Sequence, residues 1–308
     1  MWVLPLIFYL YKTSRLKYFV YYYDVLGLYE ESTRVLKKYR PHKLVFSNDH
    51  VPVQVALKLS AMQLGIETYY FQHGGITKYF PPLNFTASFL DGEDAYDKYL
   101  SIGKPKGKIE LIGNMKSRHQ NHIVNNSDRV KSIGIAINRN TGMADTISLA
   151  QTLKRRLETV KIIIRDHPAD DRSIEGSTTY ERSDPLAEST VTFLQSIDLL
   201  IATNSSIHLE AALQNVCSVY YKISPHSSHD TQGFVENGLI FYAESIDSLI
   251  ELIRGQMMKK SDVIHRAAYY DEFINSSCNY EEILNNYGIP INPIYRQGRD
   301  NLKSKIKK

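Results

Sequence analysis

Polar side chains follow three apolar runs of this 308-residue chain, and their types are those that handle anions and protons. These segments are QHGG at 72–75, RDHP at 165–168 and NSS at 204–206. Guanidinium and imidazole groups bind phosphate oxygens, and imidazole also exchanges protons near neutral pH. Together the segments predict a site for a phosphorylated ligand next to a group that can move a proton.

The strongest of these signals is IIIRDHPAD, residues 162–170. An apolar strand leads to Arg165 and His167, and Pro168 stops the strand so that both side chains stay at its end. A guanidinium fork and an imidazole donor suit phosphate oxygens. The alternative is an ion pair between Arg165 and one of the aspartates that follow it.

The segment IATNSSIHLEAALQN, residues 201–215, predicts a strand, a turn and a helix. Ser205 and Ser206 then place hydroxyls and backbone N–H groups at a helix N-terminus, where the dipole favours phosphate. Glu210 follows Ser206 by four residues, which does not fit a capping box, and one turn inside the helix it can reach ribose hydroxyls. Ordinary helix capping by the serines is the alternative.

Two candidates for a general base lie earlier in the chain. His73 ends a strand, and Gly74 and Gly75 after it permit close approach of a ligand to the backbone. Asp91, in LDGEDAY, follows another strand. A purely structural histidine and a solvated helix start remain the respective alternatives.

Strands that alternate with helices must hold these segments. Such alternation predicts parallel, doubly wound sheets whose functional groups collect at the carboxyl ends of the strands. The expected strands before the polar stretch 116–130 lie within 43–50, 67–75, 86–91 and 108–114, and those after it within 132–138, 160–168, 198–206, 216–221 and 238–243.

The polar stretch 116–130 has no apolar period and predicts a linker between two α/β domains. About four strands precede it, where a complete nucleotide-binding domain usually has about five or more. The first domain is therefore expected to be reduced, or to begin beyond the start of this chain. The predicted division is an acceptor-side domain at 1–115, the linker at 116–130, a nucleotide-donor domain at 131–260, helices crossing back at 261–295 and a basic tail at 296–308.

The composition excludes several classes of protein. The formal net charge of +4 is too small and too spread for a nucleic-acid binder, and two cysteines supply neither a disulfide framework nor a cysteine zinc site. The HxxH pairs at 119–122 and 226–229 lie in polar loops without a third ligand, so we expect no bound metal and no cofactor. P-loop, GxGxxG and GxSxG motifs are absent.

The two ends of the chain differ from the rest. No apolar run is long enough to span a bilayer, and the apolar residues 1–11 lack the charge pattern and cleavage site of a signal peptide. This segment is either a buried element or an aromatic surface resting on a membrane, and the basic tail is either solvated or held at anionic lipid. We expect a cytoplasmic protein whose termini contact the inner face of the membrane.

The order QHGG, RDHP and NSS followed by HLEA resembles the bacterial surface-polysaccharide transferases of the GT-B fold, which include CDP-glycerol glycerophosphotransferases and capsule-synthesis transferases. The pairs Asp91-Gly92, His167-Pro168 and Ser205-Ser206 are also similar to motifs of bacterial sialyltransferases. The resemblance covers about residues 40–245. It implies an α/β, GT-B-like fold with two Rossmann-like domains whose parallel sheets face a cleft.

The resemblance also implies roles for the residues already singled out. His73 would be the catalytic histidine, or Asp91 the base if the sialyltransferases are the better guide. The ribose of the donor would bind Glu210. The donor phosphates would bind four side chains, those of Arg165, His167, Ser205 and Ser206.

The activity implied is a metal-independent glycosyltransferase in the assembly of capsule or lipopolysaccharide. Its partners would be a nucleotide-sugar donor, linked to CMP, CDP or UDP, and a saccharide or lipid-linked acceptor, with no nucleic acid. Three alternatives stay open: glycerol- or ribitol-phosphate transfer from a CDP-polyol, UDP-sugar 2-epimerisation, and a non-catalytic nucleotide-sugar-binding subunit.

Overall fold

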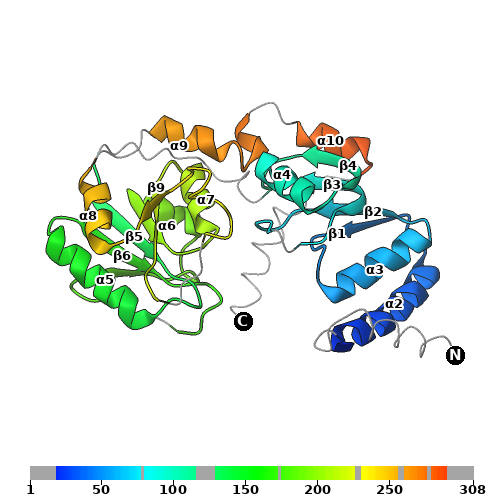
Figure 1. The fold of residues 1–308 in the computed structure, drawn as a ribbon, viewed down its shortest axis with the longest axis horizontal. Helices are drawn as coiled ribbons and strands as arrows, with labels where there is room; N and C mark the ends of the chain where they lie inside the picture. Colours follow the sequence, from blue (N-terminus) through cyan, green and yellow to red (C-terminus); the bar gives the residue numbers. More distant parts are fainter. Residues whose placement is uncertain are drawn as a thin grey trace, which may run out of the picture.

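The computed structural model describes residues 19–77, 80–115, 129–172, 175–225, 230–255, 260–275 and 279–289. Two lobes, each built around one parallel β-sheet, confirm the expected α/β class (Figure 1). Four features predicted from the sequence lie outside the described residues: the apolar segment 1–11, most of the linker at 116–128, the histidine pair at 226–229 and the tail 296–308.

The first lobe has a four-stranded sheet in the order β1-β2-β3-β4, all parallel. Because the strands follow in sequence, right-handed crossovers place their connections on one face. Tyr70 and Leu90 point to that face and pack with Tyr99 of α4. The elements are β1 (Lys43–Phe46), α3 (Pro52–Gln63), β2 (Glu67–Phe71), β3 (Asn84–Leu90), α4 (Glu93–Ile102) and β4 (Lys106–Leu111).

The opposite face of this sheet is covered by helix α10 (Tyr280–Asn286), from the far end of the described chain (Figure 1). Leu284 is buried there against Tyr69 and Phe89, and the Tyr287 ring stands edge-on to Phe89 with centroids 5.3 Å apart. The first sheet therefore obtains its second layer from residues nearly 200 positions away in sequence.

Helix α2 (Phe19–Tyr39) precedes the first strand and lies against α3. The Thr33 hydroxyl donates to Ser60 Oγ at 3.0 Å, and Ser60 Oγ donates to the Tyr29 carbonyl at 3.0 Å. The alternation of strands and helices in the sequence begins only after α2, so this helix was not predicted. Among the described residues, no helix is both long and apolar enough to cross a membrane.

The second lobe has a six-stranded parallel sheet in the order β10-β9-β8-β5-β6-β7. From β5 the chain moves to β6 and β7 on one side, then returns to β8, β9 and β10 on the other. Strand order therefore reverses between β5 and β8, a topological switch point. The strands are β5 (Ser132–Ala136), β6 (Lys161–Arg165), β7 (Glu181–Ser183), β8 (Leu199–Ala202), β9 (Cys217–Tyr221) and β10 (Phe241–Ala243).

Apolar clusters fill both faces of this sheet. Helices α5 (Met143–Arg156) and α8 (Ile246–Arg254) pack on one face. Helices α6 (Thr190–Gln195) and α7 (Ile207–Leu213) pack on the other. Helix α9 (Lys260–Ala267) lies against α7 and leads through a 3-10 turn (Glu272–Asn275) towards the first lobe.

The chain after α9 is bonded to the carboxyl edge of the first sheet, the side where its strands end. The Asp94 N–H donates to the Tyr269 carbonyl at 2.9 Å, and the Glu272 N–H donates to the Asp91 carbonyl at 2.8 Å. Gly92 lies so close to this segment that a Cβ atom there would stand 2.6 Å from the Tyr270 carbonyl carbon. The two lobes are therefore joined by close backbone contacts at this edge.

Candidate functional site

Strand register places the polar segments of the second lobe side by side. Ala136 of β5 pairs with Arg165 of β6 and with Ala202 of β8, and Ala202 pairs with Tyr220 of β9. Two residues beyond this shared row, at the carboxyl edge, each strand carries a polar side chain: His167, Asn138, Asn204 and Lys222. The RDHP and NSS segments thus flank the switch point, as a phosphate site in such a sheet requires.

Asn138 links the loops after β5 and β8 on the two sides of the switch point, and it was not among the residues predicted from the sequence. Its side-chain amide donates to Thr203 Oγ1 at 2.9 Å, and its amide oxygen accepts from the Asn140 N–H at 2.9 Å. The amide oxygen also accepts from the Thr141 hydroxyl at 3.0 Å. The polar run NRNTG after a buried strand is a usable signal, but its importance depends on strand order.

A second link joins the loops after β5 and β6. Arg172 donates from Nη2 to Asp170 at 2.6 Å and to the Arg139 carbonyl at 2.7 Å, and from Nη1 to the Thr141 carbonyl at 3.3 Å. The bond from Arg172 lowers the pKa of Asp170 to about 2. Asp170 therefore pairs with Arg172, rather than with Arg165 as one alternative reading of the sequence had it.

Arg165 is buried under the sheet edge. Its Nη1 donates to Ser183 Oγ at 2.7 Å and its Nη2 to the Glu188 carbonyl at 3.2 Å, while the guanidinium lies 5.2 Å from the Phe193 ring centroid. Burial lowers its pKa, and the charges of Glu188 and Glu210 oppose that shift. In this structure Arg165 holds β6 to β7 and the start of α6, and its contact with a donor phosphate stays a prediction.

His167 is half-buried at the end of β6. Its Nδ1 accepts a hydrogen bond from the Ala169 N–H at 3.1 Å. A neutral imidazole that accepts at Nδ1 carries its proton on Nε2. His167 can therefore donate from Nε2, which is the role expected of a phosphate ligand.

The serine turn leads into α7. Ser205 Oγ accepts a long bond of 3.4 Å from the Ile207 N–H. Among the described residues, the exposed Ser206 hydroxyl caps no backbone N–H of α7. The structure therefore does not support the alternative that Ser206 serves as an ordinary helix cap. Glu210 lies partly buried in the first turn of α7, near enough to Arg165 for its charge to raise the arginine pKa.

The carboxyl edge of the first sheet brings the two candidate bases together. Phe71 pairs with Phe89, so His73 and Asp91 each stand two residues beyond the same row. Gln72 bonds this edge, because its Oε1 accepts from the Asp91 N–H at 2.9 Å. Asn114 Nδ2 donates to Asp91 Oδ2 at 3.3 Å. His73 is exposed and Asp91 is half-buried.

Residues 230–232 connect this edge to the switch point of the second lobe. Asn204 Nδ2 donates to Thr231 Oγ1 at 2.8 Å, and the next residue, Gln232, accepts a bond from Lys98 of α4 at its carbonyl, 2.7 Å away. The Gln232 side chain lies against Gly75, where a Cβ atom would stand 2.9 Å from Gln232 Oε1. Residues 230–232, called the strap below, thus lie between the QHGG segment of the first lobe and the NSS segment of the second.

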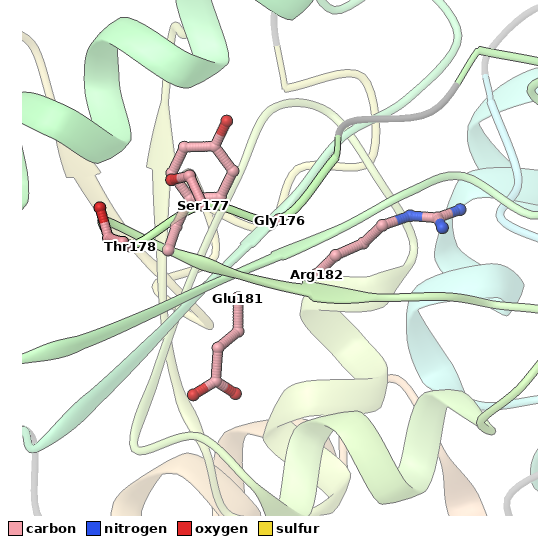
Figure 2. A pocket seen from close by; sticks show the side chains of 6 residues that line it. Gly176, Ser177, Thr178, Glu181 and Arg182 are labelled. Carbon is pink, nitrogen blue, oxygen red and sulfur yellow. The ribbon is translucent and has the colours of Figure 1, made fainter.

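A shallow surface pocket of about 460 Å³ lies elsewhere, at the start of the edge strand β7 (Figure 2). The side chains of Glu181 and Arg182 point away from each other there, as neighbours on a strand must. Its lining is Gly176, Ser177, Thr178, Tyr180, Glu181 and Arg182, which includes no predicted site residue. In the described parts of the chain, no three His, Cys, Asp or Glu side chains are grouped as a metal site requires.

Comparison with known proteins relates this architecture to solved structures. No protein-family model and no curated protein matches the chain. The structure of Staphylococcus aureus MnaA with UDP is 15% identical, with a TM-score of 0.54 over 87% of this chain and 80% of that one. UDP-GlcNAc 2-epimerase from Neisseria meningitidis, bound to UDP-GlcNAc, is 14% identical, with a TM-score of 0.53 over 81% and 77%.

CalG4, the calicheamicin glycosyltransferase, is 10% identical, with a TM-score of 0.58 over 87% of this chain and 78% of that one. The chain has the GT-B fold. This confirms the fold class expected from the sequence. The GT-B fold is shared by epimerases and glycosyltransferases among these structures, so the activity has to be argued from the residues at the two sheet edges.

Proposed function

We propose that the protein is a metal-independent glycosyltransferase that moves a sugar from a nucleotide-activated donor to an acceptor hydroxyl. The observation that carries this proposal is the strap at 230–232, which sets the switch-point residues of one lobe against the His73 and Asp91 edge of the other. In a GT-B fold, this arrangement allows the donor-binding groups of one lobe and the proton-accepting groups of the other to contact one donor and one acceptor together.

The donor binds at the switch point of the second lobe. Its phosphates accept bonds from His167 Nε2 and from the Ser205 and Ser206 hydroxyls, and Glu210 bonds the ribose. Two of the similar solved structures hold UDP or UDP-GlcNAc, which supports a nucleotide sugar as the ligand. Arg165 adds positive charge from below. These groups stabilise the charge that collects on the departing nucleotide.

The acceptor enters from the first lobe. Its hydroxyl attacks the anomeric carbon of the donor sugar as a base at the sheet edge removes the hydroxyl proton. His73 is the candidate for that base from the sequence, and Asp91 is the second.

The finer proposal rests on the resemblance of QHGG, RDHP and NSS to surface-polysaccharide transferases. It makes the acceptor a saccharide or a lipid-linked saccharide and the donor a CMP- or CDP-linked sugar in preference to a UDP-linked one. It also places the protein in the cytoplasm, at the inner face of the membrane.

A thermal-shift screen against CMP, CDP, UMP, UDP and GDP tests the donor site. A nucleotide that binds only the native state raises Tm in proportion to its affinity. We expect one nucleotide to stabilise the wild type but not Ser206→Ala. The matched control is Ser189→Ala, because Ser189 caps α6 by accepting from the Thr192 N–H at 3.1 Å. That variant should melt earlier yet keep the nucleotide shift; if no nucleotide shifts the wild type, the proposal fails.

Epimerisation of a UDP-sugar is the second candidate. The fold of this chain is about as similar to UDP-GlcNAc 2-epimerase from Neisseria meningitidis, with a TM-score of 0.53, as to CalG4, with a TM-score of 0.58. An epimerase works on the donor alone and needs no acceptor. Incubation of the protein with UDP-GlcNAc and no acceptor, followed by proton NMR of the sugar, separates the two. Appearance of the 2-epimer favours the epimerase, and an unchanged or slowly hydrolysed donor favours the transferase.

A further inference from the structure

An Asp-His pair at the end of β1 lies outside every motif used so far. Asp49 Oδ1 lies 2.8 Å from His50 Nδ1. The Asp49 side chain is only 1% exposed, whereas that of His50 is 38% exposed. A buried carboxylate thus holds one nitrogen of an imidazole whose other nitrogen is directed away from that partner.

Asp49 is fixed in place by buried hydroxyl groups. Its Oδ2 accepts from the Tyr99 hydroxyl at 2.6 Å, and the Tyr70 hydroxyl lies 3.3 Å from that of Tyr99. Burial raises the pKa of both tyrosines, so both hydroxyls keep their protons and Asp49 acts as an acceptor. The buried amine of Lys58 interacts with the charge of Asp49, which raises the lysine pKa against the larger effect of burial.

The backbone turn that carries His50 and the His50 ring itself have further contacts. The N–H groups of His50 and Val51 donate to Asn48 Oδ1 at 3.0 and 2.8 Å, which fixes the turn after β1. The His50 ring packs against Phe80 with centroids 4.3 Å apart. Since a carboxylate oxygen can only accept, the proton between the two groups lies on His50 Nδ1, and Nε2 is left as the nitrogen that can accept a proton.

Two histidines of the second lobe are arranged differently. His167 accepts at Nδ1 and so carries its proton on Nε2. His208 is fully buried, and both of its nitrogens are bonded, to Ser218 Oγ and to the Thr203 carbonyl. Neither ring offers a free acceptor nitrogen when neutral, whereas the His50 side chain is partly exposed and its Nε2 is not the nitrogen that contacts Asp49.

His50 also lies on the proper edge of the first sheet. Phe46 of β1 pairs with Tyr70 of β2, so the segment after β1 stands beside the segment that holds His73. Phe80, whose ring lies against that of His50, belongs to the connection between β2 and β3, in which Gly75 also contacts Gln232 of the second lobe. His50 and the strap at 230–232 therefore each contact a residue of this connection, Phe80 and Gly75 respectively.

We propose that His50 is the general base of this protein and that Asp49 is its positioning residue. This inference rests on the transfer proposed above and assigns to His50 the role that the sequence suggested for His73. The acceptor oxygen forms its bond to the anomeric carbon while the bond from that carbon to the donor phosphate oxygen breaks. The hydroxyl proton goes to His50 Nε2, and the nucleotide leaves with the bonding electron pair. Asp49 stabilises the imidazolium that results.

Nitrogen-15 NMR of the imidazoles tests the geometry without any substrate. We expect neutral His50 to be the Nδ1–H tautomer and His167 to be the Nε2–H tautomer, and Asp49→Asn to abolish the preference at His50. A wild-type His50 found as the Nε2–H tautomer would overturn the proposal, whatever the outcome of the nucleotide screen.

Nucleotide release from UDP-GlcNAc and CMP-N-acetylneuraminate, with water or glycerol as acceptor, tests the chemistry. We expect His50→Gln to lower kcat by about 10²–10⁴-fold, the usual contribution of a general base, and to remove the rising limb of the pH-rate profile. The nucleotide-induced Tm shift should persist in this variant. His42→Gln, which changes an exposed histidine just before β1, is the matched control and should behave as wild type.

The variants separate the two proposals. If His73→Gln removes the rising limb and His50→Gln does not, His50 is not the base although the transferase proposal stands. If the wild type binds none of the nucleotides, the transferase proposal and this role both fail. Asp49→Asn should lower kcat and leave KM for the donor unchanged, because Asp49 acts through His50.

Discussion

A neutral histidine lies directly behind the serine turn of the candidate donor site. His208 Nε2 donates to the Thr203 carbonyl at 2.8 Å, and its Nδ1 is bonded to Ser218 Oγ. The carbonyl can only accept, so the ring is held as the Nε2–H tautomer. The histidine thereby anchors the end of β8 from which Ser205 and Ser206 project.

Burial lowers the pKa of His208 to about 4, which makes the free energy of unfolding depend on pH. The unfolded chain, with a histidine pKa of about 6.5, binds the proton more tightly than the folded chain does. The stabilisation that the folded state gains from neutral His208 is therefore complete above about pH 6.5, and it is lost as the pH falls towards 4. Between pH 7 and 5 the wild type should lose about 2 kcal/mol more than His208→Gln in urea unfolding. Equal losses would contradict this origin.

Arg165 supports the site from below the sheet edge, and its loss should act first on stability. Arg165 is 4% exposed, and its guanidinium donates to Ser183 Oγ and to the Glu188 carbonyl. A buried acceptor that loses its donor costs about 1–3 kcal/mol, so Arg165→Ala should lower the free energy of unfolding by about 2 kcal/mol or more, measured by urea titration. Arg156, paired with Asp247 on the surface, is the matched control, and Arg156→Ala should cost less than about 1 kcal/mol.

At the scale of elements, the sequence predicted those strands that are buried on both faces. β6 and β8 read as short apolar runs, KIIIR and LLIA, because parallel strands are covered by helices on both sides. The edge strand β7 reads ERS, with two exposed residues, so it carries no such run and was missed. Helix α2 was missed because its aromatic and basic residues lie outside the alternating pattern.

The candidate site was predictable as separate segments but not as an arrangement. QHGG, RDHP and NSS stood out because polar residues end apolar strands. Their neighbours depend on strand order and register, which come from long-range pairing that one sequence does not display. Asn138 is important only because β8 lies beside β5, and His50 only because Tyr99, nearly fifty residues later, buries Asp49.

Helix α10 gives the clearest test at this scale. Leu284 is 3% exposed and fills the face of the first sheet formed by Tyr69, Ala87 and Phe89. Truncation of a buried leucine costs about 2–5 kcal/mol, through lost burial and the cavity left behind. Leu284→Ala should lower the urea midpoint accordingly, whereas Leu100→Ala, at a position 44% exposed on α4, should change it little.

At the scale of the whole molecule, two glycines mark contacts between the lobes that differ in stiffness. A Cβ atom on Gly92 would meet the backbone of Tyr270, which cannot move alone. A Cβ atom on Gly75 would meet only the Gln232 side chain, which can swing away.

Gly92→Ala should therefore loosen the joint between the lobes, and Gly75→Ala should leave it nearly unchanged. Amide hydrogen exchange at Asp94 and Glu272 reports on this joint, because both N–H groups bond across it. We expect faster exchange at both amides in Gly92→Ala only. Equal protection in the two variants would show that the joint does not depend on the close approach at Gly92.

The sequential order of the first sheet has a consequence for how the chain acquires its structure during synthesis. The ribosome releases β1 to β4 long before α10. The sheet face that bears Tyr69, Ala87 and Phe89 therefore stays exposed to solvent until residue 284 has emerged. Domains fold from the N-terminus as they appear, and an uncovered apolar face at that stage attracts other chains. The lobe made first is then the lobe finished last, and nascent chains that stop before α10 should depend on chaperones.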